Sequence, residues 1–139
     1  MAKKKVFVSY DHSEDLRYKD ILRAWDANDN FDFEFDQRSP NVAIDSTQAS
    51  AIKSALTTKM KEADYLLVIV GAKSASSKWM NWEISRAKES DTKLRLAAVK
   101  IVSTNTLPSG LSAVGSAAIA TSFEHDKIIT ALNAANNSY

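Results

Sequence analysis

The residues best suited to chemistry lie between Ser76 and Ile84, where the chain reads Ser-Ser-Lys-Trp-Met-Asn-Trp-Glu-Ile. Trp79 and Glu83 are four positions apart, so they share one face of a helix. A different face of that helix carries apolar side chains, among them Met80, that can pack on a sheet. Trp79 and Glu83 would then place an aromatic plane beside a carboxylate at the rim of a ligand crevice. Spacing alone leaves a second interpretation open, in which Trp79 is partly buried packing and Glu83 is a solvated helix acid.

Composition excludes several other kinds of site. Cysteine is absent, which rules out disulfides, thiolate metal sites and a cysteine nucleophile. Two histidines are too few for a histidine-rich metal site, and three scattered glycines cannot form a phosphate-binding glycine loop. The 18 Lys and Arg residues balance 17 Asp and Glu residues, so charge gives no reason to expect a nucleic-acid partner. We therefore expect neither a metal nor nucleic acid.

Length and hydropathy predict one globular domain. The 139 residues, 45% of them hydrophobic and 25% charged, are enough for a single core, and we assign residues 1–139 to one domain. No apolar run approaches the ~20 residues that span a membrane. The lysines at 3–5 lead directly into Val-Phe-Val, without the longer apolar stretch of a signal peptide. We expect a cytoplasmic protein with no membrane partner.

Strands and helices alternate along the sequence. Hydrophobic runs predict five strands, and the run from Asp64 to Gly71 is apolar without alternation, so both of its faces should be covered. Helical periodicity predicts four helices between and after these strands. The expected strands are Lys5–Ser9, Phe31–Asp36, Asp64–Gly71, Lys93–Val102 and Ala118–Thr121. The expected helices are Glu14–Ala27, one through Ile52 and Met60 behind a capping box at Asp45–Gln48, Lys78–Ser90, and one through Ile128 and Leu132.

This alternation predicts an α/β domain with a flavodoxin-like, three-layer arrangement. A five-stranded parallel sheet of order 2-1-3-4-5 would carry helices on both faces. Ligands of such sheets bind at the carboxyl ends of the strands, where the winding reverses. The segments at those ends are Ser9–His12, Asp36–Asp45 and the stretch from Gly71 into the third helix. We expect Asp36–Asp45, which has a proline and no periodicity, to form a mobile loop over the site.

Three of these segments together resemble Toll/interleukin-receptor (TIR) domains. Lys5–Tyr10 is similar to the family's first strand, which often ends in Ser-Tyr, and Phe33–Arg38 resembles its second strand and the start of its BB loop. Ser76–Ile84 resembles its W-x-x-x-E region. The matches keep the family's order from residue 5 to about residue 102. The pattern is most similar to bacterial TIR-like proteins, including those of Thoeris antiphage defence.

The resemblance implies cleavage of NAD at the nicotinamide–ribose bond, as a hydrolase or as a cyclase of the ADP-ribose product. Nicotinamide leaves a cationic substrate as a neutral molecule, so no general acid is required. The transition state resembles an oxocarbenium ion, and one positioned carboxylate can stabilise that charge. Glu83 matches the family's catalytic glutamate, and Trp79 matches the aromatic residue that would stack on a base or form the pocket wall. NAD would be a substrate, and no cofactor is expected.

The resemblance also implies four further substrate-binding residues. Ser9 and Tyr10 match positions that help to line the family's pocket, although Tyr10 is equally suited to a buried spacer. Asp36 and Arg38 open the segment that resembles the BB loop. The planar fork of Arg38 fits a pyrophosphate, and a surface salt bridge is the alternative for it.

Two classes of function follow from this resemblance. The first is an NAD-consuming enzyme that makes a nucleotide signal, self-associates and acts on a downstream effector protein that responds to the product. The second is a non-catalytic module that works by self-association or by docking on a partner, since the fold alone does not choose between the two. A receiver-type domain is disfavoured, because it needs paired acids after the first strand and Asp11 stands alone there.

Overall fold

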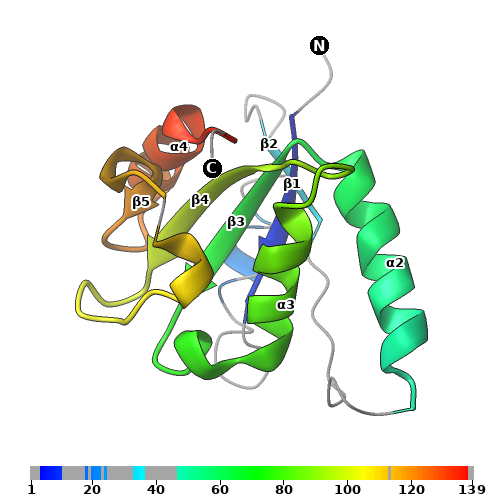
Figure 1. Ribbon diagram of the computed structural model, residues 1–139. Coiled ribbons are helices and arrows are strands. Elements are labelled where there is room, and N and C mark those ends of the chain that lie inside the picture. Colours follow the sequence, from blue (N-terminus) through cyan, green and yellow to red (C-terminus); the bar gives the residue numbers. More distant parts are fainter. Residues whose placement is uncertain are drawn as a thin grey trace.

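A parallel sheet forms the centre of the computed structural model (Figure 1), with strand order β2-β1-β3-β4-β5. All four pairs of neighbouring strands are parallel. The parallel α/β architecture predicted from the sequence is therefore confirmed, and the strands lie in the predicted order. The strands are β1 (Lys4–Ser9), β2 (Phe33–Asp36), β3 (Tyr65–Val70), β4 (Arg95–Lys100) and β5 (Ile119–Ala120). The structure describes residues 4–10, 18, 20–22, 24, 33–36 (backbone only), 47–112 and 114–137.

Helices cover both faces of this sheet. The α-helices are α2 (Ala49–Glu62), α3 (Lys78–Ala87) and α4 (His125–Ala134), and three short 3-10 helices are η1 (Ser74–Ser76), η2 (Ser109–Leu111) and η3 (Ser116–Ala118). Residues 18, 20–22 and 24, inside the first predicted helix, are helical. No helix within the described residues is both long and apolar enough to cross a membrane.

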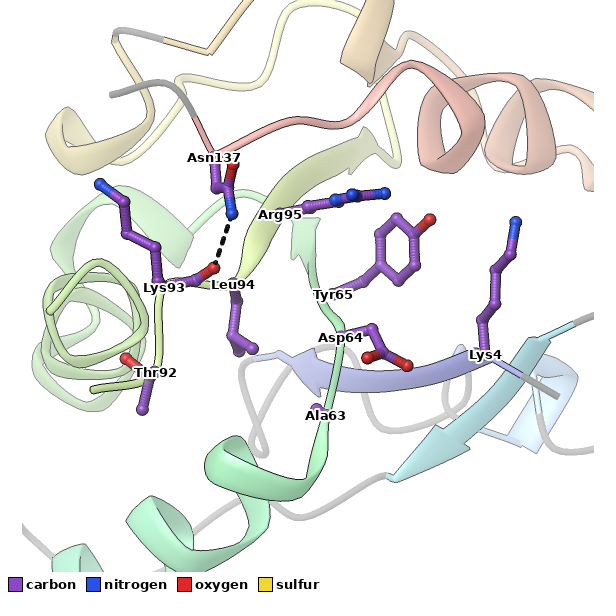
Figure 2. Close-up of a pocket in the computed structure, with 9 residues that line it drawn as sticks. All are labelled: Lys4, Ala63, Asp64, Tyr65, Thr92, Lys93, Leu94, Arg95 and Asn137. Atoms are coloured by element: carbon purple, nitrogen blue, oxygen red, sulfur yellow. Dashed lines mark hydrogen bonds between the residues drawn. The ribbon is translucent and has the colours of Figure 1, made fainter. Parts of the chain in front are cut away.

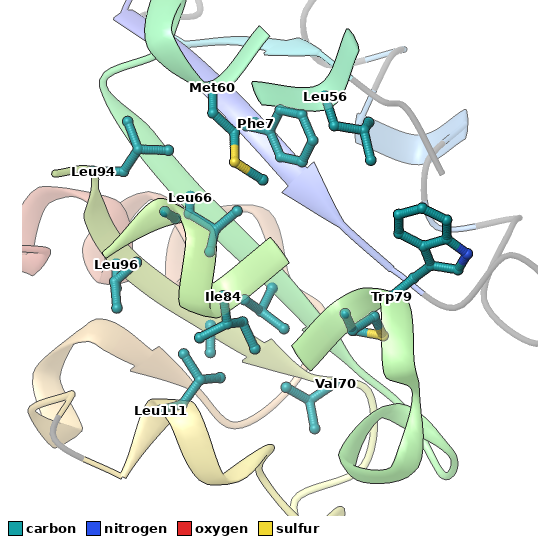
Figure 3. Packing of buried hydrophobic residues seen from close by; sticks show 14 of the residues in the cluster. Phe7, Leu56, Met60, Leu66, Val70, Trp79, Ile84, Leu94, Leu96 and Leu111 are labelled. Carbon is teal, nitrogen blue, oxygen red and sulfur yellow. The ribbon is translucent and has the colours of Figure 1, made fainter. Parts of the chain in front are cut away.

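Each face of the sheet carries its own hydrophobic cluster. Residues of α4 join one cluster, and residues of α2 and α3 join the other (Figure 3). Side chains alternate along β1, so that Val6 and Val8 enter the α4 cluster while Phe7 enters the α2–α3 cluster. All six residues of β3 are buried. The predicted covering of both β3 faces is thus confirmed, because this strand lies in the middle of the sheet between two helical layers.

Several predicted boundaries need correction. The strands predicted at Lys93–Val102 and Ala118–Thr121 are shorter, because only the residues that pair with a neighbouring strand extend. Helix α3 ends at Ala87 rather than Ser90, where a tight turn leads into β4: Leu94 N donates to Ala87 O at 3.0 Å. In the first predicted helix Leu22 is buried as expected, whereas Ile21 is 38% exposed, so the apolar face is narrower than predicted.

The segment before α2 was predicted to contain a capping box. Gln48 instead occupies the N-cap position, and its side chain makes no capping hydrogen bond. The helix therefore begins at Ala49, later than a cap at Asp45 requires. Asp45 itself and the predicted mobile loop after Asp36 lie outside the described residues.

Helix α3 is held from its outer side by η2. A Cβ built on Gly110 of η2 would lie 2.7 Å from Ile84 Cγ2, and the Lys88 ammonium of the chain just after α3 donates to the Gly110 carbonyl. Ile84 is fully buried, and its β-branched side chain has little freedom to move aside. The close approach of η2 to α3 thus depends on the absence of a side chain at Gly110.

We expect Gly110→Ala to destabilise the protein by about 1–3 kcal/mol, because the new methyl group overpacks a buried contact. Gly115→Ala is the matched control, since no atom lies within 4 Å of a Cβ at Gly115 and its φ of −63° suits alanine. Its free energy of unfolding should stay within about 0.5 kcal/mol of the parent or rise slightly. Urea unfolding of both variants measures the difference, and equal stabilities would contradict the tight η2–α3 contact.

Candidate functional site

The site centres on a contact between β1 and α3. Ser9 is the last residue of β1, and its hydroxyl donates a 2.8 Å hydrogen bond to Oε1 of Glu83. Ser9 follows Phe7 by two positions, so strand alternation turns both toward the helical layer that contains α3. Glu83 lies in the second turn of α3, which Ser77 caps by accepting a hydrogen bond from Met80 N. Residues 74 positions apart in the sequence thus form one buried polar pair.

Burial dominates the chemistry of the Glu83 carboxyl. Its side chain is 1% exposed, and Ser9 is fully buried. Desolvation raises the pKa of Glu83 from 4.5 to about 8, and the hydrogen bond from Ser9 lowers that pKa by a smaller amount. Oε2 of Glu83 makes no hydrogen bond to any residue that the structure describes. A buried carboxyl with one oxygen hydrogen-bonded and the other unpaired is suited to meeting a positive charge.

The Ser9–Glu83 pair lies at the place in the sheet where doubly wound folds bind their ligands. β2 lies on one side of β1 and β3 on the other, so the direction of winding reverses between β1 and β3. Ser9 pairs with Val68 of β3 at the carboxyl end of this boundary. Ligands of such sheets bind outside the carboxyl ends at the reversal point. The Ser9–Glu83 pair therefore lies where a ligand is expected.

The turn from β3 into α3 is fixed by a buried serine. Ser74 Oγ accepts a 2.8 Å hydrogen bond from Gly71 N and donates to Ile69 O at 3.2 Å. Ser74 is fully buried. Its hydroxyl satisfies backbone groups that the end of the strand leaves unpaired, and so sets the start of α3 relative to the sheet. The sequence analysis placed this stretch at the carboxyl end of a strand but assigned no role to Ser74.

Trp79 is part of the packing that holds α3. It is 9% exposed and belongs to the α2–α3 cluster, as Figure 3 shows. Its ring meets that of Trp82 edge-on, with centroids 5.8 Å apart. Lys53 of α2 places its ammonium 5.7 Å from the centroid of the Trp82 ring. Trp79 therefore shares the helix with Glu83 and supports its position, while its predicted contact with a base stays a prediction.

The alternative interpretation, in which Glu83 is a solvated helix acid, is wrong. Met80, Ile84 and Ala87 pack on the sheet as predicted, but Glu83 is buried as deeply as they are. Polar helix residues are usually exposed, and sequence spacing cannot show that a serine at the end of a distant strand meets the carboxyl.

Of the remaining predicted site residues, the structure describes the side chain of Tyr10 alone. Tyr10 is 4% exposed and lies in the α4 cluster, on the face of the sheet opposite to Ser9. This placement fits its alternative as a buried spacer. Asp36 ends β2, next to β1, and the structure describes only its backbone. Arg38 lies outside the described residues.

Together, the doubly wound parallel sheet and the buried polar pair at its reversal point define an α/β domain with a candidate ligand site at the carboxyl ends of its strands. A family model described as "Thoeris protein ThsB, TIR-like domain" matches residues 7–106. This match covers well over half of the 139 residues, and the chain belongs to that family.

Among solved structures, this chain is similar to the TIR domains in "Structure of the activated Roq1 resistosome directly recognizing the pathogen effector XopQ". The identity is 20% and the TM-score 0.48, over 70% of this chain. The alignment spans 57% of that chain's length. No curated protein matches the sequence.

Proposed function

We propose that this protein cleaves the nicotinamide–ribose bond of NAD, with Glu83 as the catalytic carboxylate. The observation that carries the proposal is the Glu83 carboxyl itself: it is buried, it accepts a hydrogen bond from Ser9 on one oxygen, and its other oxygen makes no hydrogen bond to any described residue. Membership of the TIR-like family supports the choice of substrate, since some TIR domains cleave NAD.

Cleavage of the nicotinamide–ribose bond requires few protein groups beyond the Glu83 carboxylate. As the bond between ribose C1′ and the nicotinamide nitrogen breaks, its electron pair moves to the pyridinium ring, and nicotinamide leaves neutral. Positive charge develops on C1′ and the ring oxygen of the ribose. A carboxylate facing that charge in a buried site stabilises the transition state without any rearrangement of solvent. Attack by water gives ADP-ribose, and attack by another group of the same molecule gives a cyclic product.

The raised pKa of Glu83 sets the pH at which this works. Below about pH 8 the free protein holds Glu83 mainly protonated, because burial penalises the charge. The positive nicotinamide ring of the substrate favours the ionised form once it lies nearby. kcat/KM reports the free enzyme and should therefore rise with pH up to about 8.

The other predicted residues take supporting roles in this proposal. Ser9 orients the carboxyl, and Trp79, which packs in the α2–α3 cluster, is proposed to form part of the pocket wall. Asp36 and Arg38 are proposed to line the NAD site, with Arg38 on the pyrophosphate, whereas Tyr10 is a buried spacer. The wider role we propose is that of a Thoeris-type defence protein in the cytoplasm, which self-associates and passes a nucleotide product to an effector protein.

The direct test is to incubate the purified protein with NAD and separate the products by chromatography, at several protein concentrations because activity is expected to depend on self-association. Release of nicotinamide together with ADP-ribose or a cyclic isomer supports the proposal. An assembled protein that leaves NAD intact favours the non-catalytic interaction module instead.

Ser9→Ala tests the ionisation argument. Without the hydroxyl, nothing offsets the desolvation of Glu83, so the pKa of the carboxyl should rise further. A hydrogen bond to a charged group contributes about 1.5–3 kcal/mol, so we expect the rising limb of kcat/KM to move up by about one pH unit or more. Ser9→Thr, which keeps the hydroxyl, should restore the profile of the parent. An unchanged limb in Ser9→Ala would show that Ser9 does not act through Glu83.

A further inference from the structure

A cavity lies at the amino ends of the strands, at the end of the sheet opposite to Glu83. Its volume is about 430 Å³, and it is lined by the first residues of three adjacent strands: Lys4 of β1, Tyr65 of β3 and Arg95 of β4 (Figure 2). These are the amino ends of the strands, whereas Ser9 and Glu83 lie at the carboxyl ends. The volume falls within the range of small-molecule sites. The proposed NAD chemistry makes no use of this cavity.

Positive charge predominates in the cavity. Among the described residues, Lys4, Lys93 and Arg95 line it together with one carboxylate, that of Asp64. Oδ2 of Asp64 already accepts a 3.2 Å hydrogen bond from the backbone N–H of Lys5. The chain as a whole has a net charge of only +1, so this concentration of cations is a local feature. A concave surface of this kind attracts anions.

The cationic groups stand on a rigid base. Tyr65 of β3 and Arg95 of β4 are paired in the sheet. Just before Tyr65, Asp64 N donates a 2.8 Å hydrogen bond to Lys5 O of β1, and Asp64 O accepts a 3.1 Å hydrogen bond from Arg95 N of β4. The Arg95 guanidinium lies 5.9 Å from the centroid of the Tyr65 ring, a cation–π distance. Figure 2 shows the charged ends of Arg95 and Lys4 extending on either side of that ring. A guanidinium held on a ring loses less freedom when it binds an anion.

Backbone strain marks the same cavity. Lys93 has φ of 46°, and it is the one non-glycine residue with positive φ in the described part of the chain. Its N–H donates to Glu89 O at 2.8 Å, and its carbonyl accepts from Asn137 Nδ2 at 3.2 Å. Strain in a lysine persists only where the surroundings enforce it, and it gathers at ligand sites. The wall of the cavity is thus held in a conformation that lysine does not prefer.

From these observations we infer that the amino-end cavity binds the phosphate groups of a small molecule, with Arg95 and Lys4 as the main ligands. The planar fork of arginine donates two parallel hydrogen bonds to phosphate oxygens, and lysine adds a point charge. Two cations on the strands that flank β3 suit a pyrophosphate better than a single carboxylate. The site is separate from the one that contains Glu83.

The test is calorimetric titration of the full chain with inorganic pyrophosphate at low ionic strength, with ADP as a second probe. Arg95→Gln and Lys4→Gln should each weaken pyrophosphate binding by about tenfold or more, since each removes a charge-assisted contact. Lys127→Gln on α4 is the matched control, because it removes the same charge from an exposed residue away from the cavity; its effect should stay under about twofold.

Saturable binding that Arg95→Gln abolishes and that Lys127→Gln and Glu83→Gln leave intact would support the inference. If Arg95→Gln and Lys127→Gln weakened pyrophosphate binding equally, the binding would reflect only the overall charge of the protein, and the inference would be overturned. ADP binding that survives Arg95→Gln but is lost when the Glu83 site is altered would also overturn it, while leaving the proposed NAD chemistry standing.

Discussion

Replacing Glu83 with glutamine is expected to lower the turnover of NAD by about a hundredfold or more. Glutamine keeps the size of the side chain and can still accept the hydrogen bond from Ser9. It removes only the negative charge, and that charge matters most when the positive charge on the ribose develops. Loss of one preorganised electrostatic group costs about 3 kcal/mol in comparable sites. Single-turnover release of nicotinamide by parent and variant measures the effect.

Binding of NAD by the variant should be little changed, because the strand-end residues and Trp79 remain in place. Glu89→Gln is the control. Glu89 was predicted to lie on the same helix, but it follows the end of α3, where it pairs with Arg86 at 3.2 Å on the surface. Its replacement should leave turnover within about twofold of the parent, since exposed pairs contribute little. Full activity in Glu83→Gln, under conditions where the parent turns over, would remove Glu83 from the mechanism.

The sequence predicted the arrangement of the sheet because its signals are local. Tyr65–Val70 is an unbroken apolar run, and only a strand covered on both faces suits it. Met80, Ile84 and Ala87 recur at helical spacing and pack on that sheet. The order of strands was predicted from the alternation of strands and helices and from the third strand, whose two apolar faces place it inside the sheet.

The candidate site was only partly predictable, because its central contact joins distant residues. The W-x-x-x-E spacing singled out Glu83, and the end of the first strand singled out Ser9. Neither signal says that the two meet, or that Glu83 is buried. Strand alternation was the available clue: Ser9 has the parity of Phe7, which faces α3, and Tyr10 has the opposite parity. Strand alternation alone thus predicts that Ser9 and Tyr10 lie on opposite faces of the sheet, and that only Ser9 faces α3.

The burial of Glu83 changes the expected effect of its replacement on stability. A solvated helix acid contributes well under about 1 kcal/mol, and glutamine would then be neutral. A carboxyl that is 1% exposed, with one oxygen unpaired in the described structure, behaves differently. Its pKa in the folded protein is about 8 against 4.5 in the unfolded chain, so the folded state binds the proton more tightly.

The second large effect is therefore on the pH dependence of stability. Because the folded pKa is raised, the contribution of Glu83 is fully present below about pH 4.5 and is lost as pH rises through about 8. Between these limits the parent should lose about 1.4 kcal/mol of unfolding free energy per pH unit relative to Glu83→Gln, which cannot ionise. Asp91, whose pKa the Arg86 guanidinium lowers, titrates below this window and is common to both proteins.

Urea unfolding of both proteins from pH 4 to pH 9 gives the difference directly, and other shared groups cancel in it. Glu83→Gln should thus match the parent near pH 4 and exceed it by several kcal/mol near pH 8. A difference that stays flat across this range would mean that Glu83 ionises in the folded protein as it does in water. The proposed chemistry, which depends on a buried carboxyl with a raised pKa, would then be wrong.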